Sequence, residues 1–429
     1  MERRRFLGLA SGFGLAGAMS SLTGCAGGAA GGGTKLTMVA ADYGNNSANT
    51  SQTYWDDVAR QFQQKNSGIT VDVKVYSWDV VDKKVAEMVA AGNAPDIAQC
   101  GAYADYAAKS LLYSVDELLS IPAQADFIGS MSDAGSVNRT QYGMPFVSSA
   151  RMLFYNKTLF KRAGIVKADG SANPPQSWDD LKTAAQKLKA AGVKVPFGLP
   201  FGPEEPAAET LIWMLGNGGN YTDDVGSYTI NSAQNLEAFQ WIKTNLSDTG
   251  LSGRNPATTN RQDVFNAFAS GDCGFLNGHP TLIQLAAKNH VDYGIAKIPG
   301  KGGQLSATVG VADWMMAFKK NGNRQQIGKF LEFAYSRQNT LKFLRAYDLQ
   351  PVTVSASNAM LADSSLKEVW PFLQELPNAR FYPDNKTSWG PVNAKLKQVV
   401  GKAATQDPMG VLGDLQRTAE AADNSAAAK

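Results

Sequence analysis

The sequence predicts an α/β protein, and three observations support this fold class. From Thr34 onward, short apolar runs alternate with segments of helical periodicity, as expected of strand and helix units. Hydrophobic residues make up 44% of the 429 residues, so the chain can bury a sizeable core. This length favours two or three domains or one elaborate fold, yet no Pro/Ser-rich linker divides the chain. Two lobes, if present, must therefore be connected by more than one passage of the chain.

The first 24 residues are typical of a removable export segment. Arg3 and Arg4 begin an R-R-x-F-L pattern that resembles a twin-arginine signal. The following apolar stretch, residues 6–22, is short and rich in glycine, which argues against the alternative of a transmembrane helix. We therefore expect residues 1–24 to be a signal peptide.

The export segment ends in Leu22-Thr23-Gly24-Cys25, which resembles a bacterial lipobox. In such a sequence the cysteine thiol carries the lipid and becomes the new N-terminus, so Cys25 is the expected lipidation site. Residues 26–33 are a Gly/Ala tract suited to a flexible tether. Residues 25–33 would thus anchor the body to a membrane surface.

Strands and helices are expected in alternation along the body. Residues 35–41 and 69–75 have the apolar content of strands, and Tyr54, Trp55, Val58 and Phe62 lie between them at helical spacing. A second helical pattern ends at Gly92, before a third strand over residues 96–99. Ser177 and Asp180 form an S-x-x-D capping box for a later helix. Further helices are expected over residues 236–246, 262–269 and 326–335, and further strands over residues 293–298 and 314–318.

Charge and composition argue against several functions. The 41 Lys+Arg and 38 Asp+Glu are interspersed, so no basic footprint for nucleic acid is present. Only 2 His and 3 Cys occur, without C-x-x-C or H-E-x-x-H spacing, so we expect neither a metal site nor a cofactor. No G-x-S-x-G elbow is present, and neither histidine lies near a Ser or Cys motif. We therefore expect a protein that is not an enzyme.

Four landmarks, in order, resemble the extracellular solute-binding proteins of carbohydrate ABC importers, a group that includes maltose-binding protein. The landmarks are residues 90–97 (A-A-G-N-A-P-D-I), residues 142–164 with Y-G-M-P-F and L-F-Y-N-K followed by P-P-Q-S-W-D-D-L at 174–181, residues 265–278, and residues 330–333 with Gln350-Pro351. The resemblance spans nearly the whole body. It implies a two-lobed periplasmic-binding-protein-like fold with two to three hinge crossings.

The same resemblance implies where the lobes begin and end. Lobe 1 would hold residues 34–144 plus about 306–338, and lobe 2 residues 145–305 plus about 339–429. The crossings would lie near residues 143–147, 305–310 and 337–339. Cys100 and Cys273 would fall in different lobes and stay unpaired, since a bridge would block hinge motion.

The implied function is that of a receptor on the outer face of the cell membrane. It would capture a sugar, most simply an oligosaccharide, as a monomer, and deliver it to the transmembrane subunits of an ABC permease and, through them, to an ATPase. Three alternatives stay open: a binder of glycerol phosphate or another small solute, a secreted glycosidase, and a sensor without a transporter.

Candidate ligand-binding residues are those that supply hydrogen bonds or aromatic faces for a sugar. By resemblance, loops after the first and third strands would present Asp42, Tyr43, Gln99, Gly101 and Tyr103, although Tyr103 fits core packing equally well. Ser148, Ser149 and Arg151 interrupt an otherwise apolar strand. Glu204 and Glu205 align with a carboxylate-bearing segment of sugar binders, with exposed loop charge as the alternative.

The aromatic platform is the uncertain part of this site. Asn277 and His279 stand where the family usually has a Gly-x-Trp. The stacking role would then pass to Trp213, Trp314 or Trp389. Asp313, next to Trp314 in an apolar strand, is the last candidate.

Overall fold

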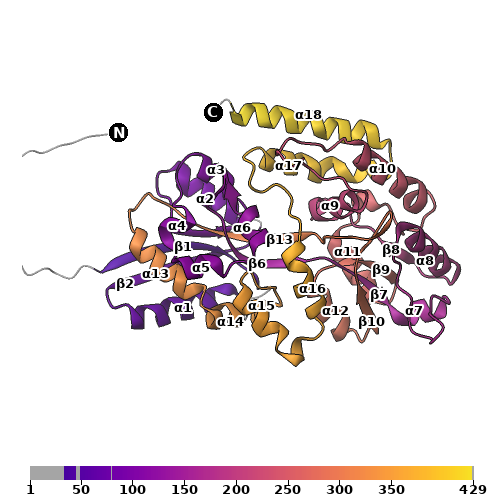
Figure 1. The fold of residues 1–429 in the computed structure, drawn as a ribbon, viewed down its shortest axis with the longest axis horizontal. Coiled ribbons are helices and arrows are strands. Elements are labelled where there is room, and N and C mark those ends of the chain that lie inside the picture. Colours follow the sequence, from indigo (N-terminus) through magenta and orange to yellow (C-terminus); the bar gives the residue numbers. More distant parts are fainter. Residues whose placement is uncertain (1–32, 45–48, 79, 428–429) are drawn as a thin grey trace, which may run out of the picture.

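The protein has two α/β lobes arranged side by side in a computed structural model, which describes residues 33–44, 49–78 and 80–427 (Figure 1). Each lobe is built around its own sheet, and helices cover both faces of that sheet. The predicted signal peptide and Cys25 lie outside the described residues. Within those residues, no helix is long and apolar enough to span a bilayer.

Lobe 1 contains the sheet with strand order β2-β1-β3-β13-β6. β1 runs parallel to β2 and β3, whereas β13 runs antiparallel to β3 and β6. The strands are β1 (Thr34–Ala41), β2 (Ile69–Tyr76), β3 (Ile97–Cys100), β6 (Met144–Ala150) and β13 (Gly310–Ala317). The helices around this sheet are α1 (Ser51–Lys65), α2 (Val81–Ala90), α3 (Ala104–Ala108), α4 (Val115–Leu118), α5 (Ile121–Ala125), α6 (Gly129–Ala134) and α13 (Arg324–Ala334), with a ribbon of β4 (Ser136–Val137) and β5 (Thr140–Gln141).

Lobe 2 contains the sheet with strand order β10-β7-β9-β8. Its strands are β7 (Met152–Asn156), β8 (Val195–Gly198), β9 (Cys273–Gly278) and β10 (Tyr293–Ala296), with a ribbon of β11 (Pro299–Gly300) and β12 (Gly303–Gln304). Its helices are α7 (Lys157–Arg162), α8 (Trp178–Ala190), α9 (Pro206–Gly216), α10 (Ala233–Ile242), α11 (Arg261–Ala269), α12 (Thr281–Lys288), α17 (Trp389–Val399) and α18 (Pro408–Ala427). A π-helical turn over Lys243–Ser247 extends α10. The capping box of Ser177 and Asp180 starts α8 as predicted.

Three chain segments connect the lobes, and they are hydrogen-bonded to one another. Arg151 alone separates β6 from β7. The second segment, residues 305–309, precedes β13, and the third, residues 379–388, precedes α17. Arg151 N donates to Val309 O at 3.1 Å, and Arg380 N donates to Thr308 O at 2.8 Å. The first crossing therefore lies after β6 and not at residues 143–147, because β6 pairs along its length with β13 of lobe 1.

The third crossing also lies at a different position from the one predicted. Residues 337–339 begin α14 (Arg337–Tyr347), which packs on α1 of lobe 1 and does not cross to lobe 2. The ring of Phe343 lies 4.7 Å from that of Tyr54, and Tyr54 Oη donates to Asn339 O at 3.1 Å. Aromatic packing thus keeps α14 with lobe 1. α15 (Val354–Leu361) and α16 (Trp370–Glu375) follow, and Phe372 of α16 reaches Phe154 of lobe 2 at 5.9 Å.

Three apolar clusters pack against the two sheets, and one of them contains residues of both lobes. One core joins β1, α1 and α14 with residues of β7 and α11, and a second fills lobe 2 between its sheet and α8, α9 and α17. A third cluster packs α2 and α3 on the opposite face of the first sheet.

Candidate functional site

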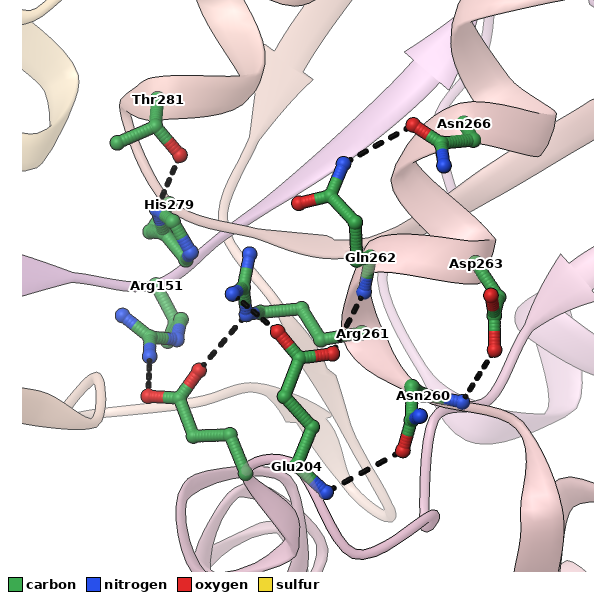
Figure 2. Close-up of polar contacts among 10 residues, drawn as sticks. Arg151, Glu204, Asn260, Arg261, Gln262, Asp263, Asn266, His279 and Thr281 are labelled. Atoms are coloured by element: carbon green, nitrogen blue, oxygen red, sulfur yellow. Dashed lines mark hydrogen bonds and ion pairs between the residues drawn. The ribbon is translucent and has the colours of Figure 1, made fainter. Parts of the chain in front are cut away.

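A network of alternating charges joins the first crossing to two helix starts of lobe 2 (Figure 2). Arg151 Nη2 donates to Glu205 Oε1 at 2.6 Å, and Glu205 Oε2 lies 3.0 Å from Arg261 Nε. Arg261 Nη2 also donates to Glu204. Arg151 is only 5% exposed, so its charge is largely removed from water. Pairing with glutamates compensates both guanidinium charges, which a buried arginine requires.

Local sequence explains where these charges stand. Glu205 is the N-cap residue of α9, with Pro206 at the first helical position. Asn260 and Asp263 form a capping box at the start of α11, which puts Arg261 in its first turn. Gln262 N donates to Glu204 Oε2 at 2.9 Å, so Glu204 lies at the N-terminus of α11, where a negative charge is stabilised.

His279 lies beside this network, after β9. Its Nδ1 is 2.8 Å from Thr281 Oγ1, and its ring lies 5.0 Å from that of Phe265. Burial lowers the pKa of His279 well below its ordinary value, and the charges of Arg151 and Arg261 lower it further. The imidazole is therefore neutral at pH 7.

A buried carboxyl stands one helical turn behind Glu205. Glu209 Oε1 accepts from Trp213 Nε1 at 3.0 Å and from Asn277 Nδ2 at 2.9 Å, which links α9 to β9. Burial raises the pKa of Glu209 to about 7, although both hydrogen bonds and Arg151 act to lower it. Asn277 and Trp213 thus hold Glu209, and both are themselves buried.

On the lobe 1 side, two of the predicted residues stabilise loops. Asp42 accepts from Ser51 N at 2.8 Å, Gly44 N at 2.9 Å and Thr50 Oγ1 at 2.7 Å. Burial acts to raise the pKa of Asp42, but these hydrogen bonds outweigh it and lower the pKa. Gly101 N donates to Asp82 Oδ1 at 2.9 Å, which ties the loop after β3 to α2.

Three other predicted residues of lobe 1 are joined by hydrogen bonds. Tyr43 Oη donates to Asp313 Oδ2 at 2.7 Å and accepts from Gln99 Nε2 at 2.8 Å. Burial raises the pKa of Asp313 to about 7; the Tyr43 hydrogen bond opposes this rise, and Asp82 and Glu205 add to it. Because Glu205 belongs to lobe 2, carboxyl groups of both lobes act on each other across this region.

Asp384, from the third crossing, is a further carboxyl in this region. Trp314 Nε1 donates to Asp384 Oδ2 at 3.5 Å. Burial raises the pKa of Asp384 well above its ordinary value, and Asp313 and Asp82 add to this rise. The neighbouring Tyr382 is partly exposed and stacks at 5.7 Å on Trp389.

Four predicted aromatic residues are core residues. Trp213 is 2% exposed, Trp314 and Tyr103 are 0% exposed, and Trp389 is 4% exposed. Trp213 packs against Trp178 at 5.4 Å, and Trp314 packs against Tyr103 at 5.2 Å. Stacking on a ligand requires an exposed ring face, which these four side chains lack. Ser149 instead supports the charge network, since its Oγ accepts from Arg151 Nη1 at 2.9 Å.

The residues that sequence reasoning missed are Trp78, Arg261, Tyr382 and Asp384. Trp78 is half-buried and meets Tyr43 edge-on at 5.5 Å. Arg261 could have been found from its place directly after the helix cap Asn260, beside the expected helix over 262–269. Tyr382 and Asp384 carry one signal, a polar and aromatic F-Y-P-D segment between two helices.

The structure also shows the state of the two cysteines of the body and of its possible metal ligands. Cys100 and Cys273 are both buried and unpaired. Among the described residues, no group of three or more His, Cys, Asp or Glu side chains is arranged to hold a metal ion.

The chain has relatives of known and putative binding function. A putative binding protein of Brucella abortus (strain 2308) is 29% identical over 365 residues, which cover 81% of this chain and 83% of the relative. The sn-glycerol-3-phosphate-binding periplasmic protein UgpB of Escherichia coli (strain K12) is 25% identical over 367 residues, covering 75% and 78% of the two chains.

Solved structures with the same two-lobed fold are sugar-binding proteins of low sequence identity. The cyclic alpha-maltosyl-1,6-maltose binding protein of Arthrobacter globiformis matches with a TM-score of 0.75 at 18% identity, over 92% of this chain and 99% of that chain. Maltose-bound MalE3 of T. maritima matches with a TM-score of 0.71 at 18% identity, over 90% and 99%. These likenesses establish the fold.

The family assignment comes from the sequence. The profile of the bacterial extracellular solute-binding proteins matches residues 46–340, more than half of the chain. This match includes α1, the first crossing, the charge network and β13. The chain therefore belongs to the family of bacterial extracellular solute-binding proteins.

Proposed function

We propose that this protein is the substrate-binding component of an ABC importer, and that it captures an extracellular sugar between its lobes and delivers it to the permease. The observation that carries the proposal is the gathering of polar side chains from both lobes around the crossings. Lobe 1 contributes Tyr43 and Asp313, the first and third crossings contribute Arg151 and Asp384, and lobe 2 contributes Glu205. Sugar hydroxyls both donate and accept hydrogen bonds, so this mixture suits them.

The charge balance favours an uncharged ligand over a phosphate. Both arginines of the network are already paired with glutamates. Asp313 and Asp384 bring further carboxyl groups to the same region. A phosphate needs free guanidinium or backbone N–H groups, and the carboxyl groups of Asp313 and Asp384 would repel it whenever they are ionised. The relation to glycerol-phosphate binders is therefore weaker support for this chain's ligand than the chemistry of its site.

A binding role also fits the glutamates better than hydrolysis. A glycosidase needs one carboxyl group as a general acid and a second as nucleophile or base. Glu204 and Glu205 are instead held in ion pairs with Arg261 and Arg151. We infer that the protein binds its sugar without cleaving it.

We further propose that Cys25 carries a lipid that anchors the monomeric receptor to the outer face of the cell membrane. The L-T-G-C sequence at residues 22–25 supports this proposal. Fractionation of cells that express the full chain tests it. The wild-type protein should be found with membranes and Cys25→Ser in the soluble extracytoplasmic fraction; equal distribution of the two would contradict the anchor.

Calorimetry and thermal-shift measurements with the full chain in detergent test the binding function. Maltose, maltotriose, raffinose and xylobiose serve as sugars, and sn-glycerol 3-phosphate serves as the anionic comparator. A sugar present at 100 times its Kd should stabilise the protein by about 2.7 kcal/mol. Stabilisation by sn-glycerol 3-phosphate alone, or products of sugar cleavage, would contradict the proposal.

A matched pair of variants locates the ligand. Glu205→Ala removes a charge of the network and should weaken sugar binding at least tenfold. Lys194→Ala removes an exposed pair with Asp272 on the outside of lobe 2 and should leave the affinity unchanged. Equal effects of the two substitutions would place the sugar elsewhere.

A further inference from the structure

Asp313 occupies an irregular position in β13. The register between β13 and β6 shifts between Asp313 and Trp314: Asp313 lies opposite Val147, whereas Trp314 lies opposite Pro145. Phe146 of β6 is thus the extra residue of a β-bulge. Such bulges bend a strand locally and change the direction in which nearby side chains point. The irregularity falls where β13 presents its acidic residue.

Asp313 lies at the end of an apolar row. Met315 and Ala317, which share its sheet face by alternation, belong to the core of α1 and α14 and are 0% exposed. Asp313 itself is partly exposed. Its carboxyl group therefore stands at the border between this core and the polar region between the lobes.

A directed chain of hydrogen bonds ends on this carboxyl group. Ala41 N donates to Gln99 Oε1 at 2.8 Å, so the amide oxygen of Gln99 is fixed by the main chain. Gln99 Nε2 then donates to Tyr43 Oη at 2.8 Å, and Tyr43 Oη donates to Asp313 Oδ2 at 2.7 Å. Ala41 N and Gln99 Nε2 can only donate and an ionised Asp313 carboxylate can only accept, so the direction of the chain is determined.

This direction decides what each residue can offer a ligand. Gln99 is 0% exposed and uses its amide within the chain. Tyr43 donates its single hydroxyl proton in the hydrogen bond to Asp313, so it has no proton left to donate to a ligand. Among the described residues, Asp313 Oδ1 accepts no hydrogen bond, so it is the acceptor at the end of the chain that is left for a ligand.

The groups around Asp313 are acidic or neutral. Tyr43 approaches from the loop after β1, Cys100 from β3, Asp82 from α2, Glu205 from the start of α9, and Tyr382 and Asp384 from the third crossing. Burial raises the pKa of Asp313 to about 7, and Asp82 and Glu205 add to the rise. An anionic ligand group would therefore be repelled here, whereas a hydroxyl donor would be bound best by the ionised carboxylate.

We propose that Asp313 is the lobe 1 residue that accepts a hydrogen bond from a ligand hydroxyl, and that Gln99 and Tyr43 are positioning residues that orient it. This inference rests on the proposed sugar-binding function and makes it more specific. The ligand class is an uncharged, hydroxyl-bearing molecule that places a donor at Asp313 Oδ1. Tyr43 and Gln99 then act through Asp313 and do not contact the sugar.

Calorimetric titration of the full chain between pH 5 and 9 tests the contact, with the sugar of the panel above that binds most tightly. Wild-type affinity should rise about tenfold per pH unit up to about pH 7 and then level off, because binding requires the ionised form. Asp313→Asn should bind about 10- to 100-fold more weakly at pH 8 and lose this pH dependence. Unchanged affinity in Asp313→Asn would overturn the inference while leaving sugar binding intact.

Tyr43→Phe tests the positioning role. It removes the hydrogen bond that opposes the raised pKa of Asp313, so the pH profile of sugar binding should move to higher pH. Tyr103→Phe is the matched control: it removes another hydroxyl in lobe 1, which donates to Ala134 O at 2.5 Å, and should not move the profile. A Tyr43→Phe profile identical to that of wild type would overturn the positioning role.

A measurement without ligand separates failure of this inference from failure of the proposed function. Infrared difference spectra recorded against pH in a Glu209→Gln background, which removes the Glu209 carboxyl group whose pKa is also about 7, should show a carboxyl group that titrates near pH 7. This signal should be absent when Asp313→Asn is added and should shift upward when Tyr43→Phe is added. No shift in Tyr43→Phe would overturn the hydrogen-bond chain even if no sugar bound. Absence of binding to every sugar would overturn the contact together with the proposed function.

Discussion

The two lobes meet the polar region between them with opposite electrostatic arrangements. Lobe 2, together with Arg151 of the first crossing, presents charges that neutralise one another, since Arg151 and Arg261 are paired with Glu205 and Glu204. Lobe 1 presents Asp313, whose partner is the uncharged hydroxyl of Tyr43. Paired charges contribute to rigidity, whereas burial raises the pKa of Asp313 to about 7, so its charge changes near neutral pH. One side of the site is thus electrostatically balanced, and the other can change its charge.

The largest loss of stability should come from removing one charge of the paired network. Glu205→Ala leaves Arg151, which is 5% exposed, without its carboxylate. An uncompensated buried charge is costly, so the free energy of unfolding should fall by about 2–4 kcal/mol. Denaturant unfolding at pH 7 measures this loss. The exposed pair of Lys194 and Asp272 is the control, because Lys194→Ala should cost less than about 1 kcal/mol. Equal losses of unfolding free energy in both variants would contradict the claim that the buried pair of Arg151 and Glu205 matters more than an exposed pair.

Glu209 tests whether lobe 2 is balanced throughout. Its pKa is raised to about 7 in the folded protein, from a model-peptide value near 4.5. A raised carboxyl pKa stabilises the fold at low pH, and this contribution disappears as pH rises from about 4.5 through 7. Glu209→Gln keeps an acceptor for Trp213 and Asn277 without the charge, so it should be more stable than wild type by roughly 1–3 kcal/mol at pH 8 and equal to it at pH 4.

The control for this prediction is Glu209→Leu, which removes the acceptor as well as the charge. It leaves the N–H groups of Trp213 and Asn277 without their partner. Stability should fall at every pH. Thermal unfolding curves recorded from pH 4 to pH 8 compare the three proteins. A Glu209→Gln variant that is less stable than wild type at pH 8 would show that Glu209 is needed in its charged form.

The ionisation of Asp313 should also make the stability depend on pH, but by a smaller free energy than that of Glu209. Its raised pKa of about 7 again means stability that is present below about pH 4 and lost as pH rises through 7. Because the side chain is partly exposed, Asp313→Asn should gain only about 1 kcal/mol at pH 8. Thermal unfolding at pH 4 and pH 8 measures this gain. A gain that persists at pH 4 would assign the effect to packing and not to charge.

The smallest effect concerns a residue outside the site. Tyr103→Phe removes a hydroxyl that donates to Ala134 O in the core of lobe 1. The loss should be about 1 kcal/mol, with sugar affinity unchanged. Denaturant unfolding and calorimetry on the same sample measure both quantities. Loss of affinity without loss of stability would return Tyr103 to the ligand site.

The local parts of the fold could be predicted from the sequence. The strands expected at residues 35–41 and 69–75 correspond to β1 and β2, and the expected cap at Ser177 starts α8. These features depend on patterns within ten residues. β13 was predicted too short, beginning at Trp314 and not at Gly310, because Gly310, Ala312 and Asp313 have low strand propensity and are held by pairing with β6.

The site could be predicted only in part, because its contacts join distant segments. Tyr43 and Asp313 were both expected in it, but their hydrogen bond spans 270 residues and left no local signal. Trp213 and Trp314 were expected to stack on the ligand, because a tryptophan next to a polar residue gives the same sequence pattern in a binding site and in a core. Only packing distinguishes them: Trp213 lies against Trp178, and Trp314 lies against Tyr103.

The connection between the lobes has a mechanical consequence. Its three segments form a ladder: Arg151 N bonds to Val309 O, Arg380 N to Thr308 O, and Gly310 N to Arg380 O. Chain segments that are hydrogen-bonded side by side bend more easily than they twist, because twisting one segment would break its hydrogen bonds to the next. We expect any rotation of one lobe against the other to follow a single bending direction at this ladder. Such a restriction would bring the same residues of the two lobes to face each other each time, although they are far apart in the sequence.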